Sequence, residues 1–287
     1  SEISQATMEE FKTTVVRTLT PHASAILLDT EFGLPAAHAR SANAGLLLAY
    51  EKSGYDNTQP GRLPDLLPDL SVRRIKELGA DAVKILIYYT PFDSDEVNTI
   101  KHAFIERIGS ECADQEIPFF LEFIGYDVDG KDEKGLEFAK LKPQVVLKSM
   151  AEFTKPRYKV DVLKVEVPVN AEYVEGSSVY KGATAYTRAE ALEHYRAAAD
   201  VTDLPFIYLS AGVSNDQFTE SLAMASEAGT PFSGVLCGRA TWKEGIPVYA
   251  KQGVAALQQW LDTEGIKNIN AVNDALGAAK PWHSRLS

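Results

Sequence analysis

The chain has 287 residues, of which 45% are hydrophobic and 24% charged, a composition typical of globular proteins with a full core. Lys and Arg number 29 against 40 Asp and Glu, and the net charge of -11 argues against a nucleic acid or an anionic membrane as the main partner. No apolar run approaches the roughly 20 residues of a membrane span. Two cysteines, Cys112 and Cys237, have no metal-ligand neighbours, so we expect a reducing, cytoplasmic location.

Short apolar runs alternate with longer helical patterns along the chain, as in a parallel sheet covered by helices. The first pattern, at residues 8–19, is helical. The expected strands are 24–29, 45–50, 82–89, 118–124, 161–167, 205–211 and 234–238. The expected helices between them are 70–78, 96–116, 141–154, 188–201 and 215–227.

Two helical segments carry a recognisable apolar side. In segment 96–116, Ile100, Phe104 and Ile108 recur every four residues and predict a buried face. From residue 247 to the end the pattern is again helical, with Trp260 on the apolar side.

The order of these elements predicts an α/β fold. Seven strands are expected where a closed (β/α)8 barrel needs eight, and because the chain opens with a helical pattern, the missing strand would be the first. A doubly wound open sheet is the competing fold, but no glycine-rich dinucleotide motif follows an early strand. We therefore expect a TIM barrel that lacks its first strand, with residues 1–287 forming one domain.

Two charged residues interrupt the apolar strand 161–167. Side chains alternate along a strand, so Lys164 and Glu166 share one face, while Leu163, Val165 and Val167 take the other. A buried lysine is costly unless it is paired, and desolvation lowers its pKa toward that of a nucleophilic amine. Lys164 is thus either a Schiff-base lysine or the partner of Glu166 in an ion pair without chemistry.

Two neighbouring strands repeat this pattern. Lys84 interrupts strand 82–89 and Glu122 interrupts strand 118–124. Three successive strands would bring Lys84, Glu122 and Lys164 side by side, with the carboxylate between two ammonium groups. Such a cluster lowers a lysine pKa and supplies an acid/base. The alternative is an ion network that only fills the barrel.

The loops after the last two strands are rich in small residues. Ser210 and Gly212 lie in the first loop, and Gly238 and Arg239 in the second. In a barrel these loops often hold phosphate, because backbone N–H groups approach the oxyanion closely and an arginine adds a charged fork. Each loop alone is also compatible with an ordinary tight turn.

With these segments in order, the sequence resembles the class I tagatose 1,6-bisphosphate aldolase family over essentially its whole length. The most specific stretches are SAILLDTEFGLPAA (24–37), AGLLLAYEKSGYD (44–56), GRLPDLLPD (61–69), GADAVKILIYY (79–89), IPFFLEFIGYD (117–127), VDVLKVEVPVN (160–170), IYLSAGVS (207–214) and GVLCGRATW (234–242). In two places it departs from the family. Members usually begin with an extra strand ending in Asp-Gln-Arg-Gly, which has no match here, and residues 172–181 resemble the family less than their surroundings do.

The resemblance implies a TIM barrel that needs neither metal nor cofactor. It implies cleavage of D-tagatose 1,6-bisphosphate to dihydroxyacetone phosphate and glyceraldehyde 3-phosphate, with loose stereospecificity, in lactose and galactose catabolism. Lys164 corresponds to the Schiff-base lysine, Glu122 to the general acid/base and Lys84 to a second active-site lysine. The corresponding phosphate-binding positions are Ser210, Gly238 and Arg239.

Further expectations complete this hypothesis. Glu166 would orient Lys164 or Lys84, and Arg62 and Lys52 are candidates for a second phosphate from sequence position alone. The partner would be a small-molecule sugar bisphosphate. The apolar helical face around Trp260 is either a surface for a homo-oligomer or a buried face within one chain. Two other functions stay open: an aldolase for another ketose 1-phosphate, such as sulfofructose phosphate, and a sugar-phosphate-sensing regulator.

Overall fold

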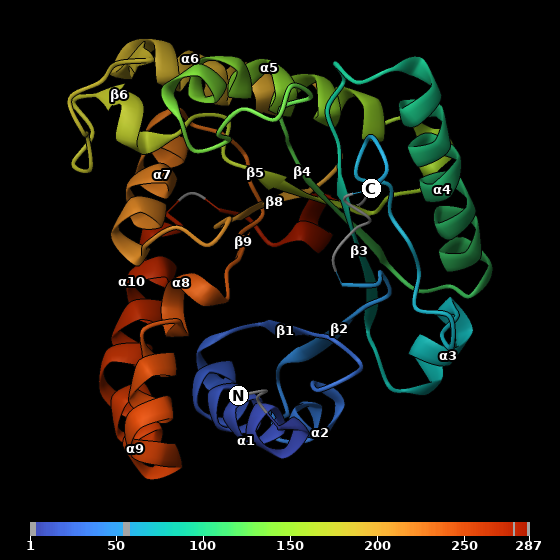
Figure 1. Cartoon of the computed structure of the whole chain (residues 1–287), viewed down its shortest axis with the longest axis vertical. Helices are drawn as coiled ribbons and strands as arrows, with labels where there is room; N and C mark the ends of the chain where they lie inside the picture. Colours follow the sequence, from blue (N-terminus) through green and yellow to red (C-terminus); the bar gives the residue numbers. More distant parts are fainter. Residues whose placement is uncertain (1–3, 54–57, 278, 286–287) are drawn as a thin grey trace.

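Seven parallel strands form the centre of the molecule and are flanked by helices (Figure 1). The computed structural model describes residues 4–53, 58–277 and 279–285. The strands pair in the order β1-β2-β3-β4-β5-β8-β9, so each strand of this sheet pairs with the next one along the chain. Between β5 and β8, the short strands β6 (Val174–Glu175) and β7 (Tyr186–Thr187) form a separate two-stranded sheet. The sheet curls into a nearly closed barrel with β1 and β9 at its edges. The expected fold, with seven strands in place of eight, is confirmed.

The barrel strands are β1 (Ala25–Leu28), β2 (Gly45–Ala49), β3 (Ala82–Tyr88), β4 (Phe119–Ile124), β5 (Val162–Glu166), β8 (Phe206–Leu209) and β9 (Val235–Leu236). The helices are α1 (Gln5–Leu19), α2 (Leu34–Ala37), α3 (Val72–Glu77), α4 (Asp95–Asp114), α5 (Leu136–Phe153), α6 (Arg188–Ala199), α7 (Asn215–Glu227), α8 (Arg239–Trp242), α9 (Gly245–Trp260) and α10 (Ile266–Ala275). Shorter helical segments are η1 (Thr20–His22), η2 (Pro156–Tyr158), η3 (Ala171–Tyr173), η4 (Leu261–Gly265) and η5 (Trp282–Arg285). Within the described ranges, no helix is long and apolar enough to cross a bilayer.

The strand predictions agree with the structure to within two residues at each end. Hydroxyl caps explain why several helices begin where they do. Ser94, Thr187 and Ser214 accept a backbone N–H from the first turns of α4, α6 and α7, and α6 also has a full capping box with Glu190. Sequence patterns placed the start of α5 five residues too late, at 141 instead of 136.

The face of α4 differs from the prediction. Ile100 is 45% exposed, whereas Lys101, Ile105, Ile108 and Cys112 form the buried stripe. Each step of four residues overshoots a full helical turn by about 40°, so a run at that spacing drifts around the helix and leaves the core. The expectation for Ile100 was therefore wrong, and a lysine takes the buried place beside it.

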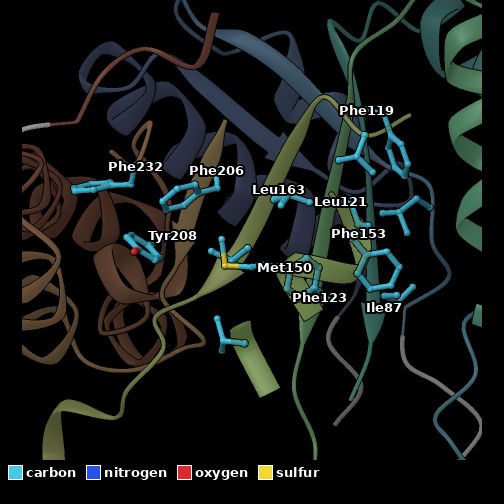
Figure 2. Packing of buried hydrophobic residues seen from close by; sticks show 14 of the residues in the cluster. Ile87, Phe119, Leu121, Phe123, Met150, Phe153, Leu163, Phe206, Tyr208 and Phe232 are labelled. Carbon is cyan, nitrogen blue, oxygen red and sulfur yellow. The ribbon is translucent and has the colours of Figure 1, made fainter. Parts of the chain in front are cut away.

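An apolar layer lies between the barrel and its helices. Phe119, Leu121 and Phe123 project outward from β4 toward Met150 and Phe153 of α5, and the cluster continues across the neighbouring strands (Figure 2). These are the alternate residues of each strand, as the two-residue period requires. Their alternation fixes which side chains point inward.

The inward residues near the amino ends of the strands form an apolar barrel floor: Leu47, Ala82, Phe120, Val162 and Ile207. Trp282 of η5 packs against this floor, with its ring 5.7 Å from that of Phe120 in an edge-to-face arrangement. Two carboxylates secure the strands at this end, because Asp81 accepts the N–H of Leu46 and Asp161 that of Phe119. Polar chemistry must therefore sit above this floor.

A second apolar cluster joins α1 to the helical segments around residue 260. Phe11, Val15 and Leu19 of α1 pack with Leu257 and Leu261, and the half-buried Trp260 lies against them. The placement of Trp260 on the apolar side is confirmed. Because α1 already covers this face, its packing is explained within one chain.

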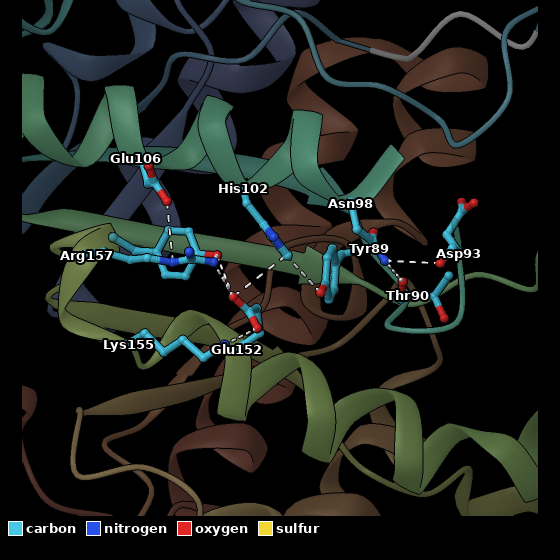
Figure 3. A network of polar contacts seen from close by, with 10 residues as sticks. Tyr89, Thr90, Asp93, Asn98, His102, Glu106, Glu152, Lys155 and Arg157 are labelled. Carbon is cyan, nitrogen blue, oxygen red and sulfur yellow. Dashed lines mark hydrogen bonds and ion pairs between the residues drawn. The ribbon is translucent and has the colours of Figure 1, made fainter. Parts of the chain in front are cut away.

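A polar network ties the outside of α4 to α5 and η2 (Figure 3). Glu152 Oε1 lies 2.8 Å from Arg157, and the same oxygen is 3.8 Å from His102 Nε2. His102 Nε2 in turn lies 3.0 Å from the hydroxyl of Tyr89. Burial alone would raise the pKa of Glu152, but hydrogen bonds from Lys155 and Tyr158 outweigh it and hold the pKa at about 2.

Glu152→Gln is expected to lower the free energy of unfolding near neutral pH by about 2 kcal/mol, since an amide is a weaker acceptor for cations. The pKa of this carboxyl is depressed from 4.5 in the folded state, so its stabilisation is complete above pH 4.5 and disappears as the pH falls toward 2. Urea unfolding of both proteins, near neutral pH and at about pH 3, measures this convergence. Glu106→Gln, which removes a half-exposed partner of Arg157, is the control; a gap for Glu152→Gln that persists in acid would contradict the assignment.

Candidate active site

Three charged side chains project into the barrel above its apolar floor. Lys84 comes from β3, Glu122 from β4 and Lys164 from β5, and all three are buried. Glu122 stands opposite Lys164 in the parallel register, whereas Lys84 stands opposite Phe120. The structure therefore brings together the three residues that interrupt apolar strands in the sequence.

Glu122 bridges the two lysines. Its Oε2 lies 2.8 Å from the Nζ of Lys84 and 2.7 Å from the Nζ of Lys164. Both side chains of each pair are at least nine-tenths shielded from solvent. One carboxylate oxygen thus serves two amines in an environment of low dielectric.

Glu51, which sequence reasoning missed, completes the cluster. It follows β2 and places its Oε1 2.5 Å from the Nζ of Lys84. Across the described part of the chain, no donor reaches its other oxygen, Oε2. Lys84 therefore contacts two carboxylates, Lys164 contacts one, and Glu51 keeps one acceptor unused.

These contacts push the two lysine pKa values in opposite directions. Burial lowers the pKa of Lys164, and the nearby charge of Lys84 lowers it further, against the pull of Glu122. Burial also disfavours charge on Lys84, but Glu51 and Glu122 together outweigh it and raise its pKa. Lys164 is thereby biased toward the free amine and Lys84 toward the ammonium form.

The pKa values of the two carboxylates, Glu51 and Glu122, are also shifted in opposite directions. Burial raises the pKa of Glu51, more than Lys84 can offset. Burial acts likewise on Glu122, but Lys84 and Lys164 outweigh it and lower the pKa of that carboxyl. Pairs of groups whose environments separate their pKa values are the arrangement that acid/base chemistry requires.

The described contacts of Glu166 include neither Lys164 nor Lys84, the lysines that it was expected to orient. Its Oε1 lies 3.2 Å from the Nζ of Lys142 on α5, and its Oε2 accepts the backbone N–H of Gly125 at 2.8 Å. It therefore contacts the residue that directly follows β4, the strand that carries Glu122. Sequence patterns did not single out Lys142, because a lysine in a polar helix usually faces solvent.

The loop after β8 turns sharply over the barrel mouth. Ser210 is buried, and the next two residues, Ala211 and Gly212, adopt left-handed φ angles of 48° and 73°. A Cβ at Gly212 would come within 3.4 Å of the Arg239 guanidinium, which packs on this glycine. The loops after β8 and β9 thus meet, as the sequence predicted, with Gly238 directly before α8.

A cavity of about 460 Å³ opens at the same mouth. Its wall includes Arg239 on one side, Glu51 of the buried cluster, and the side chains of Lys52, Arg62 and Tyr88. The two basic residues singled out from sequence position alone therefore share one cavity with Arg239. The same cavity is also lined by Glu51, the carboxylate that pairs with Lys84.

Fold and site together define an aldolase-type (β/α) barrel with a buried lysine pair above its apolar floor. Residues 1–244 match the DeoC/LacD family aldolase model, and the chain belongs to this family. It is 55% identical over 286 residues to tagatose 1,6-diphosphate aldolase 2 of Enterococcus faecalis, covering 99% of this chain and 86% of that protein. Tagatose 1,6-diphosphate aldolase of Listeria monocytogenes is 55% identical over 279 residues, covering 97% and 82%.

Solved structures share the fold at low identity. A fructose-bisphosphate aldolase from Plasmodium falciparum superposes with a TM-score of 0.66 at 14% identity, covering 97% of this chain and 84% of that one. At this identity the similarity concerns the barrel alone.

Lys84→Met is expected to destabilise the fold by about 3–5 kcal/mol, because it leaves the buried carboxylate of Glu51 without its cation and Glu122 with Lys164 alone. Urea unfolding measures the loss. Adding Glu51→Gln should restore part of the stability, since it removes the stranded charge. Lys140→Met, at a half-exposed pair with Glu137, serves as the control and should change little; a Lys84→Met protein as stable as that control would refute the argument.

Proposed function

We propose that the chain is a Schiff-base aldolase that cleaves D-tagatose 1,6-bisphosphate to dihydroxyacetone phosphate and glyceraldehyde 3-phosphate. The observation that carries the proposal is the buried amine of Lys164, whose pKa is lowered by burial while a carboxylate lies 2.7 Å away. The names of relatives at 55% identity support the substrate. The proposal treats residues 1–287 as one aldolase domain.

Lys164 is the nucleophile in this mechanism. Its neutral amine attacks the ketose carbonyl at C2, and loss of water leaves an iminium that accepts the electron pair of the breaking C3–C4 bond. Glu122 takes the proton of the C4 hydroxyl, so that glyceraldehyde 3-phosphate leaves as an aldehyde. A proton returned to C3 of the enamine and addition of water then release dihydroxyacetone phosphate and the free lysine.

Lys84 and Glu51 prepare the site for this step. Lys84 stays charged because of its two carboxylate partners, and that charge suppresses protonation of Lys164. In the mechanism it also stabilises oxygen atoms of the substrate. Glu51 lines the cavity, and its unused oxygen would accept a hydrogen bond from a substrate hydroxyl.

Two groups of residues would hold the phosphates. The backbone and side chains of the loops after β8 and β9 bind the phosphate nearest the reacting carbonyl: Ser210, Gly212, Gly238 and Arg239. Lys52 and Arg62, which line the same cavity as Arg239, bind the distal phosphate. Remote binding energy then fixes the carbonyl beside Lys164.

Glu166 has an orienting role in this proposal. Through the N–H of Gly125 and the ammonium of Lys142 it fixes the end of β4 against α5. Because Glu122 lies on that strand, its carboxylate keeps its position between the two lysines. This role is indirect, since the described contacts of Glu166 do not include Lys84 or Lys164.

The proposed setting is the cytoplasm, where a sugar bisphosphate from lactose and galactose breakdown is the partner, without nucleic acid or membrane. Both cysteines are free thiols, which fits a reducing compartment. The chain is also proposed to form a homo-oligomer.

Lys164→Met should abolish both turnover and covalent trapping, lowering kcat by about 1000-fold or more, since methionine cannot form an imine. Dihydroxyacetone phosphate and borohydride are added to each protein, and the adduct is located by peptide mass spectrometry. Lys181→Met, at an exposed lysine, is the control and should trap one equivalent as the wild type does. Full trapping in Lys164→Met would assign the Schiff base elsewhere.

Arg239→Ala should raise KM for the bisphosphate by about tenfold to a hundredfold with kcat little changed, because it removes a charged phosphate ligand and leaves the amine cluster intact. Steady-state kinetics measure both constants. Arg73→Ala, at a solvent-exposed arginine of α3, is the matched control. An unchanged KM in Arg239→Ala would remove this residue from the phosphate site.

A further inference from the structure

One buried lysine takes no part in the cluster of Lys84, Glu122 and Lys164. Lys101 lies on α4 and is fully buried, at 0% exposure. Its Nζ donates to the hydroxyl of Tyr126 at 2.9 Å and lies 4.6 Å from the centre of that ring. Burying an ammonium group costs free energy that a methionine of similar size would not, so its retention points to a function.

Tyr126 connects this lysine to two loops at the mouth of the barrel. The tyrosine follows β4, and its hydroxyl donates to the carboxylate of Asp93, in the loop between β3 and α4. The same hydroxyl lies 3.2 Å from the carbonyl oxygen of Gly61, in the loop after β2. Asn98 of α4 holds the Asp93 loop in turn, through the carbonyl oxygen of Thr90 (Figure 3).

The segment of Gly61 and Arg62 is docked onto α4 in a restricted conformation. Their φ angles are 82° and 49°, and a Cβ on Gly61 would approach Cγ1 of Val97 to 2.4 Å. Only glycine fits there, so the backbone is held close to the helix. The backbone position from which the Arg62 side chain extends is therefore fixed.

Among the described residues, the rings of Tyr126 and Tyr88 and the carboxylate of Glu133 help to set the direction of the Arg62 side chain. Its guanidinium lies 4.9 Å from the ring centre of Tyr126 and 5.2 Å from that of Tyr88. Glu133 pairs with one end of the guanidinium at 2.6 Å. The group borders the cavity that also contains Lys52 and Arg239.

We propose that Lys101 and Tyr126 are positioning residues for Arg62 and thereby set the preference for a ketose carrying a second phosphate. The tyrosine hydroxyl occupies the Asp93 carboxylate and Lys101 donates to that hydroxyl, so this acidic group is kept from drawing Arg62 away from the cavity. The ring of Tyr126, fixed by these bonds, packs on a face of the guanidinium and so orients the N–H groups that bind an anion in its plane. The inference rests on the proposed aldolase function.

The test compares two substrates that differ only at the far end, D-tagatose 1,6-bisphosphate and D-tagatose 1-phosphate. Lys101→Met and Tyr126→Phe should each lower kcat/KM for the bisphosphate by about tenfold, through KM, because one charged phosphate contact is weakened. The 1-phosphate should be turned over as by the wild type, within about twofold. Trapping of dihydroxyacetone phosphate on Lys164 should also be unchanged, since that ligand lacks the second phosphate.

Arg62→Ala and Lys101→Met together form a double-mutant cycle. If Lys101 acts through Arg62, combining Lys101→Met with Arg62→Ala should cost no more than Arg62→Ala alone. Lys148→Met is the matched control, because Lys148 also lies over an aromatic ring, that of Phe92, on the outside of the barrel. This control should leave kinetics with both substrates unchanged.

The outcomes separate the roles. Equal losses on both substrates would reduce Lys101 and Tyr126 to structural residues, and unchanged kinetics or additive losses with Arg62→Ala would also overturn the inference. If Lys101→Met fails to fold, Tyr126→Phe, which removes only the hydroxyl, still decides it. A wild type that forms no adduct would instead overturn the aldolase function and this inference with it.

Discussion

The shared carboxylate oxygen of Glu122 is the constraint on which the rest of the site depends. One oxygen lies within 2.8 Å of two lysine amines in a barrel interior with little water. Burial disfavours charge on both lysines, and the attraction of Glu122 is shared between them, so the lysine without a further carboxylate favours its neutral form. Glu51 decides which one, because its carboxylate supports Lys84 and leaves Lys164 as the amine without a second partner.

The strand register makes that sharing possible. Glu122 and Lys164 stand opposite each other on neighbouring parallel strands, while Lys84 stands opposite Phe120, nearer the amino ends. A shift of one residue in either pairing would turn a charged side chain into the outer apolar layer. The alternation of apolar and charged residues in β3, β4 and β5 therefore specifies both the core and the site. Folding and chemistry depend on the same pattern.

Much of this could be predicted from the sequence, because folding alone seldom places a charged residue between apolar ones on a buried strand. Lys84, Glu122 and Lys164 stand out for this reason, and the short apolar runs predict all seven strands that the described residues form in the barrel. The remaining partners lie where such a signal is absent. Glu51 follows a strand among polar neighbours, and only its position at the carboxyl end of β2 distinguishes it. Lys101 and Lys142 lie on helices, where a lysine ordinarily faces solvent.

Short elements escaped prediction for another reason. The two-stranded pair β6 (Val174–Glu175) and β7 (Tyr186–Thr187) has only two residues in each strand, too few for any periodicity to be read. It lies between β5 and α6. Segments of this kind are specified by tertiary contacts rather than by local sequence preference.

The tryptophan beneath the barrel has a consequence for the timing of folding. Trp282 lies beyond every strand of the barrel in the chain, yet it packs against Phe120 directly below the charged layer. During synthesis, the strands that carry the two lysines emerge long before this ring does. Until it docks, the side of Phe120 that it covers is open to solvent. The apolar base of the barrel is therefore completed only by the segment after α10.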